Sequence, residues 1–250
     1  MFYSKNLKRI KKLNHCFFSR KNGFSKGVYR SLNCGKGSKD NKINIYKNLK
    51  YVAKKINVKN KNLILMHQTH SNKVVEIKKN NYKKKIKADA MITRMKGVAL
   101  GVLTADCVPV ILYDVKNEVI GCVHAGWRGA FIGVIKNTII KIKKLNSKTE
   151  IYACVGPCIS KKNYEVDQKF YKKFMAKSFK NKKYFSYKSE FKKLFNLRKF
   201  VIDKLNEFKV KVDQINLDTY SEKSNFFSYR RSTKLGHKDY GRCISAVCML

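Results

Sequence analysis

The sequence predicts a mixed α/β domain in which helices cover a sheet. Short segments rich in β-branched residues, separated by turn residues, occupy the first two thirds of the 250-residue chain. Segments with a helical period of apolar residues lie between and after them. Because the chain has only two prolines and no Gly/Ser-rich linker, residues 1–250 are expected to form a single domain.

Eight segments are expected to be strands because β-branched residues dominate them. In chain order they are 27–32, 62–66, 73–77, 89–93, 98–107, 108–114, 118–126 and 151–156. Two helices are expected, at 129–145 and 195–210. The apolar residues that set the helical period of the first are Phe131, Val134, Ile135, Ile139 and Ile142.

The net charge of +41, from 57 Lys and Arg against 16 Asp and Glu, first suggests a nucleic acid or an anionic membrane as partner. The excess is nearly all lysine, and it is scattered through a chain also rich in Asn, Ile, Phe and Tyr, a pattern typical of an AT-rich genome. No recognition motif accompanies it, so neither a specific nucleic-acid partner nor a membrane partner is expected.

The N-terminal segment lacks a signal-peptide apolar stretch, and no segment reaches the length of a membrane helix, so we expect a cytoplasmic protein. The eight cysteines are then expected to be free thiols or metal ligands.

A predicted hairpin brings a thiol and an imidazole together. If residues 114–117 form its loop, Tyr113 faces Glu118 and Cys107 faces His124 on the same side of the sheet. At that spacing the sulfur and a ring nitrogen reach one metal ion or each other. A one-residue bulge would instead place them on opposite faces.

The alternative is that Cys107 is a buried thiol and His124 a hydrogen-bonded strand-end residue. The carboxylate and guanidinium in the flanking "TADC" and "HAGWRG" favour the functional interpretation. If the strand at 62–66 continues through "HQTH", Gln68 and His70 share one face, which makes His70 a better third ligand than His67. Two His and one Cys leave a fourth position open, as in catalytic zinc sites.

The order and spacing of several motifs resemble the YfiH-like laccase-domain family from about His15 to the C-terminus. These motifs are "HCFFSRKNGFSKGVYRSLNCG", "HQTHS", "ADAMIT", "GVLTADCVPVIL", "VHAGWRG", "GPCISKKNYEV" and "FFSYRR…GRCISAVCML". The resemblance implies a single-domain α-β-β-α sandwich similar to the catalytic domain of the cytotoxic necrotizing factor toxins. It also implies a zinc ion held by His70, Cys107 and His124.

The resemblance further implies a purine nucleoside phosphorylase that cleaves adenosine, inosine, guanosine and methylthioadenosine with phosphate and also deaminates adenosine. Phosphate binding needs fixed cations, and arginine suits it through its forked guanidinium. The candidates are Arg128 beside the metal residues and Arg230, Arg231 and Arg242 near the C-terminus; a surface salt bridge is the alternative for each. Asp106 or Asp89 is the candidate for moving a proton.

Other functions are weighed beside this one. Cys107 and His124 also suit a hydrolase that cleaves amides through a cysteine nucleophile, or a factor that edits peptidoglycan precursors. A basic nucleic-acid binder would keep its affinity without Cys107. A true multicopper oxidase is disfavoured because the chain has only five histidines, although one copper ion can occupy the same three residues.

Overall fold

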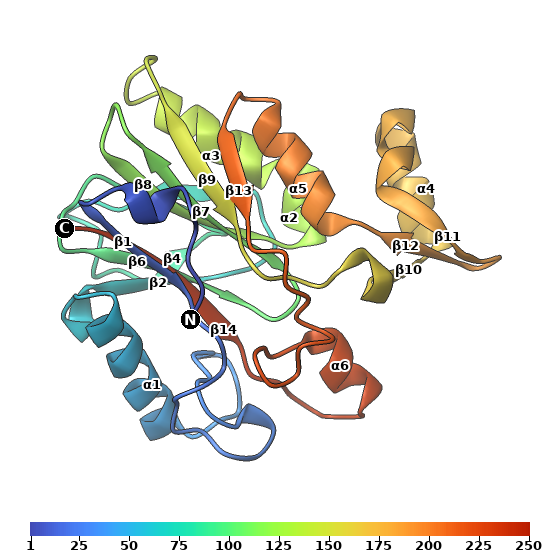
Figure 1. Ribbon diagram of the computed structural model, residues 1–250, viewed down its shortest axis with the longest axis horizontal. Helices are drawn as coiled ribbons and strands as arrows, with labels where there is room; N and C mark the ends of the chain where they lie inside the picture. The colour runs from blue at the N-terminus through green and yellow to red at the C-terminus, as the bar shows by residue number, and fades with distance from the viewer.

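The computed structural model describes residues 1–250 and contains two large sheets and one small one (Figure 1). The first large sheet has the spatial order β1 (Leu13–Phe17), β14 (Cys243–Met249), β6 (Ala99–Thr104), β2 (Leu63–His67) and β4 (Ile86–Lys87). The second has the order β13 (Lys211–Gln214), β9 (Ile151–Val155), β7 (Val108–Asp114), β8 (Val119–Ala125), β5 (Ala90–Thr93) and β3 (Val74–Glu76). The small sheet has the order β10 (Glu165–Asp167), β12 (Lys192–Phe195) and β11 (Phe185–Ser189).

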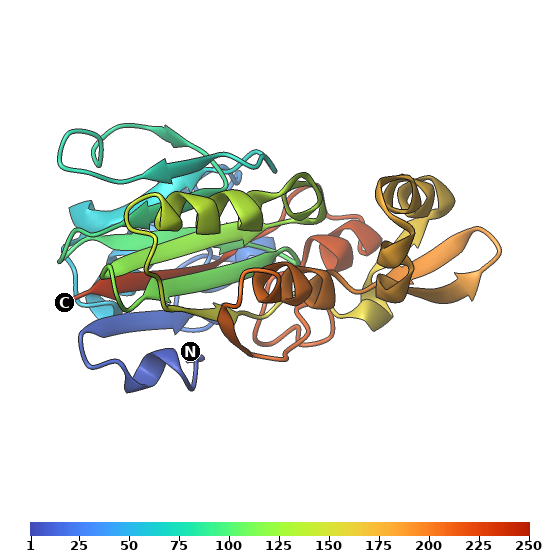
Figure 2. The same ribbon diagram turned by 90° about the horizontal axis from the view of Figure 1, so that it is seen from above.

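Four helices lie on the outer faces of the two large sheets (Figures 1 and 2): α1 (Lys42–Lys55), α2 (Trp127–Ile132), α3 (Val134–Lys143) and α5 (Leu197–Asn206). The other two, α4 (Gln168–Lys177) and α6 (Tyr229–Lys234), lie to one side of these sheets (Figure 1). Helix α1 packs on the five-stranded sheet, where Val52 and Ile244 share one apolar cluster. Helices α2, α3 and α5 pack on the six-stranded sheet.

A third apolar cluster lies between the two large sheets, because each presents an apolar face to the other. Leu100 and Val247 of the first sheet meet Ile111 and Tyr113 of the second. With the two outer clusters this gives four layers in the order α, β, β, α, which confirms the predicted mixed α/β sandwich. The likeness to the necrotizing-factor domain stays a prediction.

An arm carries the small sheet and α4 and projects to one side (Figure 2), and its apolar residues join the cluster that packs on the six-stranded sheet. Its interior is aromatic: the Phe174 ring is fully buried, stacks on Phe170 with ring centroids 4.9 Å apart, and contacts Phe195 at the same separation. The arm begins directly after the loop that follows β9 and returns to the body at α5. It therefore borders the end of the second sheet at which the residues of interest gather.

Six of the eight predicted strands correspond to single observed strands with small changes at their ends, and 98–107 is shortened to β6. The strand predicted at 27–32 is wrong: Gly27–Tyr29 forms a 3-10 turn, and both Gly27 and Ser31 have positive φ. The helix predicted at 129–145 is two helices, because Gly133 interrupts it in the left-handed conformation, with φ of 98°. Sequence reasoning did not find β1, β4, β10 to β14, α1, α4 or α6.

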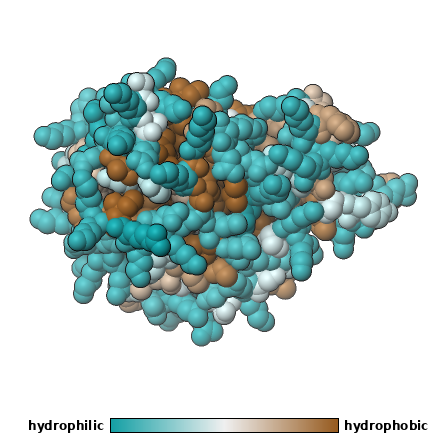
Figure 3. Space-filling view, turned by 45° about the horizontal axis from the view of Figure 1, so that its top comes forward, coloured by the Kyte–Doolittle hydropathy of each residue, from teal (hydrophilic) through white to brown (hydrophobic).

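Hydrophilic side chains spread over the visible face in the space-filling view and do not gather in one region (Figure 3). This agrees with the scattered lysines of the sequence. None of the helices combines the length and the apolar composition that crossing a membrane requires.

Candidate active site

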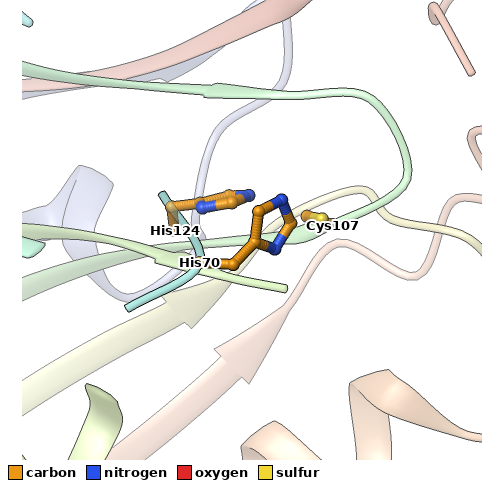
Figure 4. A group of neighbouring side chains, drawn as sticks. All are labelled: His70, Cys107 and His124. Atoms are coloured by element: carbon orange, nitrogen blue, oxygen red, sulfur yellow. The ribbon is translucent and has the colours of Figure 1, made fainter. Parts of the chain in front are cut away.

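His70, Cys107 and His124 lie together at one end of the six-stranded sheet. Their nitrogen and sulfur atoms are all within 4.8 Å of one another, and the two imidazole rings are 4.7 Å apart at a steep angle (Figure 4). His70 belongs to the loop after β2, Cys107 directly precedes β7, and His124 is in β8. His124 is buried, whereas His70 is exposed, so the group opens outward from the sheet.

The hairpin of β7 and β8 brings two of these residues together in a register that differs from the predicted one. Asp114 pairs with Val119, so the loop is 115–118, and Pro109 rather than Cys107 faces His124. The predicted pairing is therefore wrong by two residues. Because side chains alternate with a period of two, this shift leaves Cys107 on the same face as His124, as its diagonal neighbour.

The Asp89 carboxylate holds both histidines in place. It is fully buried and accepts hydrogen bonds from the backbone N–H groups of Thr69, His70 and Ser71 at 3.2, 3.0 and 2.6 Å. These bonds wrap the chain around the carboxylate at His70, which has a φ of 56°. Asp89 Oδ1 also lies 2.8 Å from His124 Nδ1, which leaves Nε2 of that ring for the cluster.

These contacts set the protonation of the group. Burial raises the pKa of Asp89, but hydrogen bonds from His124 and Ser71 outweigh it, and the net shift is downward. Burial would lower the pKa of His124, but Cys107 and Asp89 raise it to about 9. Burial, and next His124, lower the pKa of His70. The Asp89 carboxylate is thus held by several hydrogen bonds, and its position does not support the predicted role in moving a proton.

The three side chains suit a metal ion. One sulfur and two imidazole nitrogens form a donor set used for zinc and copper, and three protein ligands leave one position open. Gly126 leaves room at the cluster: a Cβ atom there would lie 2.5 Å from His70 Nδ1 and 3.0 Å from Cys107 Sγ. The space beside these atoms is therefore kept free by a glycine.

A pocket of about 440 Å³ adjoins the cluster, within the range of small-molecule sites. It is lined by His70, Ala105, Asp106, Cys107, Trp127, Ile159, Tyr164, Leu197, Tyr229, Arg230 and Tyr240. Aromatic rings dominate the wall, and Arg230 is its one arginine or lysine. A larger depression of about 520 Å³ beside α1 is lined by lysine, asparagine and apolar side chains and has no metal-ligating group, so the chemistry assigns the site to the smaller pocket.

The predicted phosphate-binding arginines lie in different places. Arg230 lines the pocket; its Nη1 donates to the Glu165 carbonyl at 2.9 Å, and its guanidinium lies 5.5 Å from the centre of the Tyr164 ring. Arg231 donates from Nη1 to the backbone carbonyls of Thr219 and Tyr220. The Arg242 guanidinium lies 4.3 Å from the centre of the Tyr240 ring, and Arg242 does not line the pocket.

Arg128 is exposed and does not line the pocket. The positions of Arg128, Arg231 and Arg242 therefore do not support direct roles in this pocket.

Asp106 borders the pocket but is not a free base. It is 7% exposed, and its carboxylate accepts three hydrogen bonds, from Thr219 Oγ1, Ser228 Oγ and the Arg230 N–H. Burial raises its pKa, while these bonds oppose the shift. The predicted proton transfer by Asp106 is not supported by this geometry.

Sequence reasoning missed the aromatic wall, because its members come from four separate segments. Trp127 and Tyr229 had a local signal, since each directly precedes an arginine in a motif already singled out, "GWRG" and "SYRR". Tyr164 also lies in a quoted motif, "GPCISKKNYEV", whereas Tyr240 had no such signal.

The family model described as multi-copper polyphenol oxidoreductase laccase matches residues 14–250. The chain belongs to this YfiH-like laccase-domain family. It is 37% identical over 191 residues to purine nucleoside phosphorylase RP494 of Rickettsia prowazekii (strain Madrid E), covering 76% of this chain and 79% of the relative.

Two further comparisons agree. Purine nucleoside phosphorylase YfiH of Escherichia coli (strain K12) is 31% identical over 224 residues, or 88% of this chain and 89% of the relative. The crystal structure of Neisseria meningitidis protein NMB0706 aligns with a TM-score of 0.85 and 29% identity over 96% of this chain and 95% of the other.

The description of the family implies several copper ions, whereas this chain brings together the ligands for only one metal ion. His15 is buried and accepts a hydrogen bond from the Ser4 N–H at 2.9 Å, and His67 and His237 are exposed away from the cluster. Of the five histidines only two join Cys107, enough for one ion.

Proposed function

We propose that this chain is a purine nucleoside phosphorylase acting on adenosine, inosine, guanosine and methylthioadenosine. The observation that carries the proposal is the His70, Cys107 and His124 cluster beside an aromatic pocket with one arginine. The names of the relatives support the reaction class. Because the pocket draws on residues from 70 to 240, we also propose that residues 1–250 act as one domain.

In the proposed reaction a phosphate oxygen bonds to the anomeric carbon of the sugar and the glycosidic C–N bond breaks. The electron pair of that bond leaves with the base, which takes up the proton that the attacking hydrogen phosphate gives up. Arg230 holds the phosphate through its guanidinium, whose carbonyl contact with Glu165 uses one of its two terminal nitrogens. Trp127, Tyr164, Tyr229 and Tyr240 provide ring faces for the planar base.

We propose zinc as the ion held by His70, Cys107 and His124, with copper as the alternative, because two imidazoles and one thiolate suit both. When bound, the ion would supply Lewis-acid chemistry beside the pocket. With the ion bound, the His124 ring would keep its proton on Nδ1, which donates to Asp89, and Nε2 would be free of a proton for this role. The adenosine deaminase side activity stays a prediction that the same assay tests.

The experiment incubates metal-analysed protein with adenosine, with and without phosphate, and resolves adenine, inosine, hypoxanthine and ribose 1-phosphate. We expect phosphate-dependent adenine that is lost in H70A, C107A and H124A. H67A is the matched control, because His67 is exposed and outside the cluster. Full activity in any of the three cluster variants contradicts the site assignment, and inosine formation identifies deamination.

A comparison of arginine variants tests the phosphate site. R230M should raise the phosphate KM by about tenfold or more, since a charged hydrogen bond contributes about 1.5–3 kcal/mol. R128M is the comparison, because Arg128 follows Trp127 but does not line the pocket. A larger rise of the phosphate KM in R128M than in R230M would indicate that Arg128, and not Arg230, binds the phosphate.

A second candidate function rests on the contacts that join Cys107 to His124 and His124 to Asp89. A thiol beside an imidazole that a buried carboxylate orients is also the arrangement of a cysteine hydrolase. It suits amide hydrolysis or the editing of peptidoglycan precursors. Alkylation separates the two: slow modification of Cys107 in zinc-loaded protein supports its role as a ligand, whereas fast modification favours the hydrolase.

A further inference from the structure

Asp106 joins two parts of the site that are far apart in the sequence. Its Oδ1 accepts from Thr219 Oγ1 at 2.7 Å, and its Oδ2 accepts from Ser228 Oγ at 2.9 Å and from the Arg230 N–H at 2.7 Å. Thr219 and Ser228 are themselves buried, at 3% and 1% exposure. All three donors thus converge on one carboxylate, and neither of its oxygens is left without a partner.

The contacts with Ser228 and Arg230 fix the first turn of α6. Ser228 is the N-cap of this helix, and its hydroxyl accepts from the Arg231 N–H while it donates to Asp106. The Arg230 N–H is one of the free amides of the first turn, and the carboxylate satisfies it. Since α6 has only six residues, its orientation depends on this attachment. Tyr229 and Arg230, which line the pocket, lie in the same turn.

The same residue is bonded directly to Cys107. Asp106 has a φ of 83°, and its carbonyl accepts from the Ile159 N–H at 3.0 Å, so both its side chain and its main chain are held. A change in the carboxylate position is therefore passed through one peptide unit to the Cys107 thiol. On the other side it is passed through one hydrogen bond to Arg230.

We propose that Asp106 is a positioning residue that keeps the Cys107 thiol and the Arg230 guanidinium at a fixed relative position, without touching substrate. Only the kinetic part of this proposal, which is the effect on phosphate binding, rests on the proposed function. It predicts that loosening the contacts with α6 weakens phosphate binding more than nucleoside binding. It also predicts that changing the carboxylate itself weakens metal binding through Cys107.

The experiment compares T219V, S228A and D106N with T138V. Thr138 is a matched control, because it is also a buried threonine whose hydroxyl donates to one acceptor, the Val134 carbonyl, in α3. T219V and S228A should each raise the phosphate KM about tenfold, which corresponds to about 1.4 kcal/mol, and leave the adenosine KM within about twofold. T138V should leave both constants unchanged.

Zn²⁺ affinity, measured by competition with a chelator, gives a readout that does not depend on activity. D106N should lower it about tenfold and T138V should not, with both measured where thermal unfolding shows the proteins folded. Variants that unfold at lower temperature but keep the wild-type phosphate KM and Zn²⁺ affinity would overturn the positioning role.

If wild-type protein does not use phosphate, the proposed function fails while the Zn²⁺ comparison still decides this inference. Weaker Zn²⁺ binding in D106N then supports it, and wild-type affinity refutes it.

Discussion

Replacing Gly126 by alanine should strongly weaken metal binding while leaving the fold intact. The backbone at this position has φ of −67° and ψ of 161°, which alanine adopts without strain. The added methyl, however, would lie 2.5 Å from His70 Nδ1 and 3.0 Å from Cys107 Sγ, against an ordinary contact distance of at least 3.4 Å. The His70 ring must therefore retreat by about 0.9 Å, well beyond the ~0.2 Å tolerance of a metal bond.

Because His70 is exposed, its ring can swing outward at little cost to the fold. The stability of the metal-free protein should change by no more than about 1 kcal/mol, since glycine-to-alanine changes at compatible positions have effects of this size. Zn²⁺ affinity should fall at least about 100-fold, more than is usual for an outer residue of a metal site. Zinc should then no longer raise the unfolding temperature at concentrations that stabilise the wild type.

The assay is chelator competition for Zn²⁺ combined with thermal unfolding with and without zinc. G37A is the matched control, because a Cβ atom at Gly37 meets no other atom within 4 Å. Wild-type Zn²⁺ affinity in G126A would refute the assignment of both His70 and Cys107 as ligands.

Three more predictions follow from buried groups. D89N should lower Zn²⁺ affinity about 10- to 100-fold in the same competition assay, because the carboxylate orients His124, and wild-type affinity would contradict that role. Burial lowers the pKa of His15 to about 4, so the unfolded chain takes up a proton between about pH 6.5 and pH 4 that the folded chain does not. The contribution of His15 to the free energy of unfolding is then complete above pH 6.5 and falls by up to about 3 kcal/mol toward pH 4. Urea unfolding at several pH values should show a shallower fall in H15Q. F174A should cost about 3–5 kcal/mol in urea unfolding, since the ring is fully buried among other aromatic rings; a loss below about 1 kcal/mol would show that the arm adds little to stability.

The central strands could be predicted from sequence because their side chains are buried on both faces. All seven residues of β7 and of β8 are buried, which explains their continuous apolar runs. The hairpin register could not be fixed, because nothing in 114–118 selects one loop over another. The juxtaposition of Cys107 and His124 survived the error because it depends only on the alternation of side chains.

Helix α1 was missed because its polar face is dense in lysine and asparagine, and only Ile45, Asn48, Leu49, Val52 and Ala53 are buried in its 14 residues. The roles of Asp89 and Asp106 were beyond sequence reasoning for a different reason. Their hydrogen-bond donors lie 18 to 35 residues away for Asp89 and 113 to 124 residues away for Asp106. Only the folded structure shows which carboxylates already accept hydrogen bonds.

The tryptophan in the aromatic wall of the pocket allows binding to be followed by intrinsic fluorescence. Trp127 is the only tryptophan of the chain and it lines the pocket, where its ring packs 4.9 Å from Phe170 and lies under the Lys173 ammonium at 5.5 Å. All indole fluorescence therefore originates beside the site. A purine base stacked there should quench it, so occupancy by nucleosides, and its dependence on phosphate or metal, can be followed in unlabelled wild-type protein.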